Sequence, residues 1–227
     1  MSVESQRPVI DARGLAKSRV EALADGIFAV AMTLLVLDIK SPEQRSFASN
    51  GEIISYLVQL EHSFAMYAIS FVVLGIFWIG HHVLFHFVRH MDRRLLWINL
   101  GFLLLITLVP FSTDLLGDHG HLSLPALVYG INLLALGALL VLHLRYLARH
   151  PHLATDELTP AAVKHMYREA RVYGLVPLLS IAVSFYSPRL GMYLYLLLAI
   201  PVLGPSRMDR LAQPPAHGRR DPSSEDS

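Results

Sequence analysis

Long runs without a charged residue constrain this chain more than any other feature. Five such runs occur in its 227 residues, at 62–88, 95–113, 122–144, 172–188 and 190–206. A bilayer core of about 30 Å is crossed by roughly 20 helical residues, so each run is close to the length of one span. Residues 20–39 form a sixth segment of this length, with Glu21 and Asp25 near its start. The pattern predicts an all-α integral membrane protein with six transmembrane helices per subunit.

The overall composition agrees with a membrane protein and excludes several kinds of site. Only 16% of the residues are charged, whereas soluble domains carry about 25%. The net charge of +1 gives no reason to expect a nucleic-acid partner. The sequence has no cysteine, which excludes disulfides, thiolate metal sites and thiol nucleophiles.

The lysines and arginines predict how the chain crosses the membrane. With the N-terminus inside, sixteen of the 19 basic residues fall before segment one, between segments two and three, between segments four and five, and after segment six. The other three are Lys40, Arg45 and Arg189. By the positive-inside rule, both termini are predicted in the cytoplasm. We therefore expect a cytoplasmic segment at 1–18, a six-helix domain at 19–206 and a disordered cytoplasmic tail at 207–227, whose composition is polar.

The first segment has an apolar line along one side. At about 100° per residue, Val30, Leu34 and Leu37 lie within roughly 60° of one another. Thr33 lies beside this line, and Gly26 continues it toward the start of the helix. Such a line is typical of helix packing, so by itself it identifies no function.

Asp25 lies on a different face, about 140° from Val30. An ionisable residue inside a span is costly and usually has a partner in the bundle. Segment two ends in FWIGHHVLFHFVRH, which supplies His81 and His82, and segment three opens with LLWINLGF, which supplies Trp97 and Asn99. We predict a hydrogen bond from Asp25 to one of the two histidines, with Trp97 or Asn99 as a further donor.

These motifs resemble the transmembrane protein 175 family of potassium channels. Arg19-x-x-x-Leu23-Ala24-Asp25-Gly26 is similar to the family pattern R-x-x-x-F-S-D-G/A, and FWIGHH, DRRLLWINL and LVPFSTDLL follow in the family's order. Leu23 stands where the family usually has phenylalanine, and Ala24 where it usually has serine. The missing serine hydroxyl changes part of the family's inter-helix network.

The resemblance implies a fold, an assembly and a function. Members with one six-span repeat form homotetramers whose first helices surround the ion path, so the partners expected here are three further copies of the chain, the bilayer and monovalent cations. The family's constriction then falls on Val30, with further pore-lining positions at Thr33, Leu34 and Leu37. The expected function is a potassium-permeable channel, modestly selective over sodium, in the cell membrane (the bacterial inner membrane). No catalytic residue, metal or cofactor is expected, and K⁺ is the permeant ion.

Three other functions fit parts of the sequence. His82, His86 and His90 are spaced four residues apart and would line one helix face, as in a histidine-rich membrane metalloenzyme. Asp25 and the histidines would also suit a proton-coupled carrier, because histidine titrates near neutral pH. A membrane scaffold without transport activity would need the apolar line of the first segment only for packing.

Overall fold

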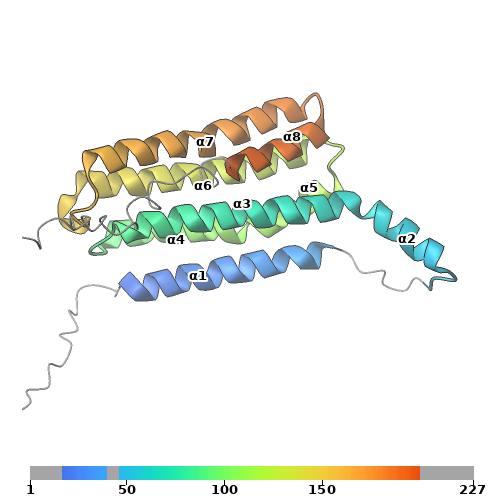
Figure 1. Ribbon diagram of the computed structural model, residues 1–227, viewed down its shortest axis with the longest axis horizontal. Coiled ribbons are helices and arrows are strands. Elements are labelled where there is room, and N and C mark those ends of the chain that lie inside the picture. Colours follow the sequence, from blue (N-terminus) through green and yellow to red (C-terminus); the bar gives the residue numbers. More distant parts are fainter. Residues whose placement is uncertain (1–16, 40–45, 200–227) are drawn as a thin grey trace, which may run out of the picture.

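The computed structural model describes residues 17–39 and 46–199, and these form an elongated bundle of helices (Figure 1). The elements are α1 (Lys17–Leu34), η1 (Leu35–Asp38), α2 (Asn50–Gln59), α3 (Glu61–His86), α4 (Arg93–Thr107), α5 (Val109–Asp118), α6 (Ser123–Arg149), η2 (Pro151–Leu153), α7 (Pro160–Ser184), α8 (Pro188–Leu194) and η3 (Tyr195–Ala199). The all-helical prediction is confirmed for these residues. Most of the predicted N-terminal segment, the end of segment six and the whole predicted tail lie outside them.

Four segments are long and apolar enough to cross a membrane: Lys17–Leu37, Glu61–His86, Arg93–Asp118 and Ser123–Arg149. They correspond to predicted segments one to four. The third is longer than the predicted 95–113 and consists of two helices, which meet at Leu108. Pro110 explains the break, because proline has no N–H to donate to the turn before it.

The two C-terminal helical segments do not meet the same length and composition test. The predicted segment 172–188 is the second half of α7, whose first half carries Lys164, Arg168, Glu169 and Arg171. The described part of the predicted segment 190–206 is a short helix, α8, followed by η3. Both pack beside α6, where α7 makes a close approach: a Cβ added at Gly137 would lie 3.0 Å from the Cβ of Tyr173.

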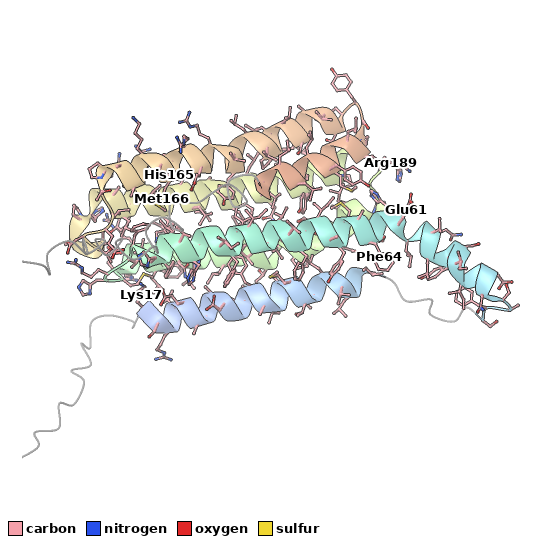
Figure 2. The ribbon with its side chains drawn as sticks, viewed as in Figure 1. Lys17, Glu61, Phe64, His165, Met166 and Arg189 are labelled. Atoms are coloured by element: carbon pink, nitrogen blue, oxygen red, sulfur yellow. The ribbon has the colours of Figure 1, made fainter. Side chains whose placement is uncertain are left out.

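The two ends of the bundle carry different charges. Figure 2 shows Lys17 and His165 at one end and Glu61 and Arg189 at the other. The connections between α3 and α4 and between α6 and α7 lie at the Lys17 end (Figure 1), and most of the described lysines and arginines lie in or near them. Most of the lysines and arginines that the structure describes therefore lie at one end, as the prediction of orientation requires. Which side of a membrane this end faces stays a prediction.

Helix α2 was not predicted from the sequence. Ser49 caps it by accepting a hydrogen bond from the Glu52 N–H at 3.3 Å, and the Glu52 carboxylate accepts one from the Ala48 N–H at 2.9 Å. A serine followed three residues later by glutamate is a known start signal for helices. The helix is joined to α3 through Leu60 alone and extends away from the bundle (Figure 1).

Buried polar side chains hydrogen-bond to one another between three helices of the core. The Thr113 hydroxyl donates to the Ser70 hydroxyl at 2.9 Å, and Ser70 is paired with the Tyr129 hydroxyl at 3.1 Å. Asn132 donates its amide to the Ser112 hydroxyl at 3.4 Å. These bonds join α3, α5 and α6 at positions that are almost fully buried. Buried polar groups are costly unless they are paired in this way.

The connections at the Lys17 end fasten to each other, and we call residues 86–92 together with 150–157 the clasp. The Arg89 N–H donates to the Leu153 carbonyl at 2.7 Å, and the Thr155 N–H donates to the Phe87 carbonyl at 2.9 Å. Two side-chain contacts join the same segments: an ion pair between Arg89 and Asp156 at 2.7 Å and a hydrogen bond between His86 and Glu157 at 2.6 Å. The clasp ties the α3–α4 hairpin to the α6–α7 hairpin.

Asp92, at the edge of the clasp, caps α4. Its carboxylate accepts hydrogen bonds from the Leu95 N–H at 2.7 Å and from the Tyr146 hydroxyl. Partial burial acts to raise the pKa of Asp92, but the hydrogen bonds from Tyr146 and Leu95 outweigh it, so its pKa lies below the ordinary 3.8. The folded state therefore gains stability from the ionised group above pH 3.8, and loses it as the pH falls through the lower, folded-state value.

Replacement of Asp92 should show this contribution directly. Asp92→Ala is expected to cost about 1 kcal/mol at pH 7, because the helix loses its cap. Asp92→Asn keeps a capping oxygen and should cost less, but it also removes the titrating group. Thermal unfolding of the two variants and the parent protein, compared at pH 7 and pH 3, checks both points. An equal acid-induced loss of stability in the parent and in Asp92→Asn would contradict the assignment.

Candidate functional site: the exposed face of α1

Helix α1 has a buried face and an exposed face. Ala24, Phe28, Ala31 and Leu35 are at most 2% exposed and pack against α3, α4 and α5. Val30, Leu34 and Leu37, by contrast, are 57%, 42% and 71% exposed. The three apolar residues predicted from the periodicity thus lie on the outer surface of the subunit, and none is buried inside it.

The end of this helix keeps its apolar residues aligned. From Leu35 the backbone tightens into the 3₁₀ helix η1, in which side chains three residues apart eclipse one another. Leu37 therefore lies above Leu34. Thr33 is also exposed, and its hydroxyl donates to the Val30 carbonyl at 2.8 Å, so its oxygen lone pairs remain free to accept from other groups.

Asp25 forms a hydrogen bond with Trp78, a partner that was not predicted from the sequence. Its carboxylate accepts a hydrogen bond from the Trp78 indole N–H at 2.8 Å. The predicted bond to His81 or His82 is therefore wrong for this subunit. Trp78 lies one helical turn before His82, on the same exposed side of α3, and the two rings pack at 5.8 Å. The indole can only donate, a property that would have identified it as a partner for the carboxylate.

His81 instead turns into the core and pairs with Asn99. The imidazole Nε2 and the Asn99 amide oxygen are 2.8 Å apart, and both residues are at most 4% exposed. The ring stacks on Phe102 at 5.3 Å and on Phe85 at 4.3 Å. The pair joins α3 to α4, so the predicted residues do form an inter-helix contact, but one separate from Asp25.

The remaining motif residues lie apart from the carboxylate. Arg19 and Trp97 are both exposed, Trp97 by 63%, and within the described residues neither hydrogen-bonds to Asp25. Gly26 is exposed too, and a Cβ added there would meet no atom within 4 Å. The predicted network is therefore divided: Asp25 with Trp78 on the surface, and His81 with Asn99 in the core.

The histidine spacing does not build a metal site. Helix α3 ends at His86, so His90 leaves the helix and cannot share a face with His82 and His86. Across residues 17–39 and 46–199, no group of three histidine or acidic side chains is placed to hold a metal ion.

Comparison with known proteins identifies the family of this chain. Residues 19–110 match the family described as endosomal/lysosomal potassium channel TMEM175. A potassium channel of Streptomyces collinus is 32% identical over 188 residues, which cover 80% of this chain and 89% of the relative. The chain belongs to the TMEM175 family. A potassium channel of a Chryseobacterium species is 31% identical over 85% of this chain and 95% of its own length.

The fold agrees with this assignment. The crystal structure of a lysosomal potassium-selective channel TMEM175 homolog from Chamaesiphon minutus matches with a TM-score of 0.70 and 30% identity, over 82% of this chain and 95% of that one. The resemblance inferred from the motifs is thus confirmed. The residues that match the family include α1 from Arg19 onward, η1, α2, α3 and α4.

The hydrogen bond between Asp25 and Trp78 can be tested by a double-mutant cycle. We expect Asp25→Ala and Trp78→Phe to be coupled by about 1 kcal/mol, which is below the usual range for hydrogen bonds to charged groups because both side chains are exposed. The cycle of Asp25→Ala with His82→Ala is the matched control and should show much weaker coupling. Unfolding free energies in detergent provide the measurement. Stronger coupling to His82 than to Trp78 would restore the sequence-based prediction.

Proposed function

We propose that this protein is a potassium-permeable cation channel of the cell membrane, modestly selective over sodium, whose pore is lined by α1 from four identical subunits. The observation that carries the proposal is the exposed line of Val30, Leu34 and Leu37 on a helix that packs against its own subunit along the opposite face. The permeant ion is inferred from the relatives in Streptomyces collinus and Chryseobacterium, which are both named potassium channels. In the assembled channel each subunit crosses the membrane six times, with both termini in the cytoplasm.

The other exposed residues of α1 support an assembly around this helix. Ala22, Gly26 and Ala29 are all exposed and follow one another by four and three residues. This spacing places them on one side of the helix, next to the apolar line. Small residues let neighbouring membrane helices approach closely. The α1 helices of adjacent subunits would therefore pack along this side, while the larger side chains face the central axis.

The proposed pore conducts differently from channels that have a carbonyl filter. The sequence contains no TVGYG-like segment, so a row of backbone carbonyls is not available to replace the hydration shell of the ion. Rings of Val30, Leu34 and Leu37 would instead close the path by dewetting and admit ions when the path widens enough to hold water. Valine at the narrowest ring is smaller than leucine or isoleucine, which favours a leakier and less selective pore.

Reconstitution of the full chain in a planar bilayer tests the function. Under a potassium/sodium gradient we expect unitary currents whose reversal potential lies on the potassium side of zero. Saturating uptake without unitary currents would identify a carrier, and the absence of any flux would identify a scaffold. Adding a proton gradient in the same experiment measures whether protons share the path.

A further inference from the structure

We propose that the exposed face of the first half of α7 binds the headgroup of an anionic phospholipid. Lys164, Arg168 and Arg171 follow one another by four and three residues, so they lie on one face of this helix. All three are exposed. Figure 2 shows nitrogen-bearing side chains that point away from the bundle near His165, at the same end of the molecule as Lys17.

The same face becomes apolar within one turn. Leu175, Leu178 and Leu179 continue the spacing and are 64%, 55% and 49% exposed. Phe185, at the far end of the helix, is 64% exposed. The three basic residues and the three leucines thus form one continuous surface, positive at one end and apolar at the other. This surface is complementary to a phospholipid, whose charged headgroup lies above its apolar acyl chains.

The length of the apolar part sets the depth of the basic residues. The uncharged stretch 172–185 spans about 21 Å at 1.5 Å per residue, which is less than the roughly 30 Å of a bilayer core. Arg171 and Arg168 therefore lie within reach of the boundary between acyl chains and headgroups. Arginine and lysine place their charge at such a boundary by extending along apolar surface.

The acidic residues nearby contact other groups and are not paired with the basic residues of this face. Asp156 pairs with Arg89, Glu157 pairs with His86, and Glu169 pairs with His165 on the flank of α7 at 3.3 Å. Among the described residues, none forms an ion pair with Lys164, Arg168 or Arg171. A lipid phosphate is the ligand that offers negative charge and an acyl chain together.

Spin-labelled lipids can measure this binding on the full-length protein. In phosphatidylcholine vesicles, we expect spin-labelled phosphatidylglycerol to be immobilised by the protein more strongly than spin-labelled phosphatidylcholine, with a preference that weakens at high salt. The variant Lys164→Gln/Arg168→Gln/Arg171→Gln should lose roughly a hundredfold in relative affinity for phosphatidylglycerol, at about fivefold for each basic residue near the surface. Arg171→Gln alone should lose about a third of this effect on a logarithmic scale.

The matched control removes three other basic residues at the same end of the bundle. Arg93→Gln/Arg94→Gln/Arg149→Gln changes the net charge equally but leaves the α7 face intact, and it should keep the preference for phosphatidylglycerol. Size-exclusion profiles and thermal unfolding establish that each variant is folded. A parent-like preference in the α7 variant, or an equal loss in the control, would overturn the proposal.

Discussion

Val30→Asn is expected to raise the unitary potassium conductance by about tenfold and to reduce the preference for potassium over sodium. Four amide groups in the narrowest ring would hydrogen-bond to water and keep the constriction wet, which lowers the barrier that an apolar ring presents to an ion. A tenfold change in rate corresponds to a barrier lower by about 1.4 kcal/mol. Single-channel recording in planar bilayers under a potassium/sodium gradient measures both quantities.

Val36→Asn is the matched control for this variant. Val36 is the same residue type on the same helical segment and is 48% exposed, compared with 57% for Val30. It lies about 80° from Val30 around the axis, at about 100° per residue to Leu34 and about 120° per residue in η1, so it stands off the line of Val30, Leu34 and Leu37. Its substitution should leave conductance and selectivity near the parent values. Unchanged currents in Val30→Asn, or equal changes in both variants, would remove Val30 from the pore.

Phe28→Ala is expected to lower stability by about 3 kcal/mol, the lower end for loss of a large buried aromatic side chain. Phe28 is 1% exposed, and its ring packs against His81 at 6.1 Å and Phe102 at 6.0 Å. The buried residues of α1 are Val20, Ala24, Phe28 and Ala31, and a smaller share of this span is buried than of the other three candidate spans. Because small residues make up much of its buried face, Phe28 provides a large share of the packing that holds this helix in place.

Phe111→Ala serves as the control, since this residue is 63% exposed and its removal leaves no cavity. We expect thermal unfolding in detergent to shift to a clearly lower temperature for Phe28→Ala and little for Phe111→Ala. Loss of the α1 contact should also impair conduction in bilayers. A parent-like unfolding temperature for Phe28→Ala would show that α1 is fixed by other contacts, such as the bond between Asp25 and Trp78.

Much of the helical architecture could be predicted from the sequence because spans have to be long and uncharged. Runs 62–88 and 122–144 correspond closely to α3 and α6 for this reason. The second half of α7 was found as well, but not the charged half before it, because a search for uncharged runs stops at Arg171. Helix α2 was missed because it is short, although Ser49 and Glu52 carried a start signal.

Side-chain pairing was less predictable, and the donor to Asp25 shows why. Periodicity correctly separated Asp25 from Val30, since it depends only on rotation about one helix. The choice among Trp78, His81 and His82 depends on how α1 and α3 rotate and slide against each other. Those two quantities are set by packing, through residues such as Phe28, and no local pattern encodes them.

By itself, the sequence determined that this chain forms apolar helices, that its basic residues gather at one end, and that α1 carries an apolar line apart from its carboxylate. These properties follow from the cost of burying charge in lipid and from the rotation per residue of a helix, both of which act locally. The tertiary structure alone decided that Trp78 bonds to Asp25, that His81 turns inward to Asn99, and that the apolar line of α1 stays outside the subunit. These outcomes depend on contacts between segments far apart in the chain, where shape and register decide which of several chemically suitable groups can meet.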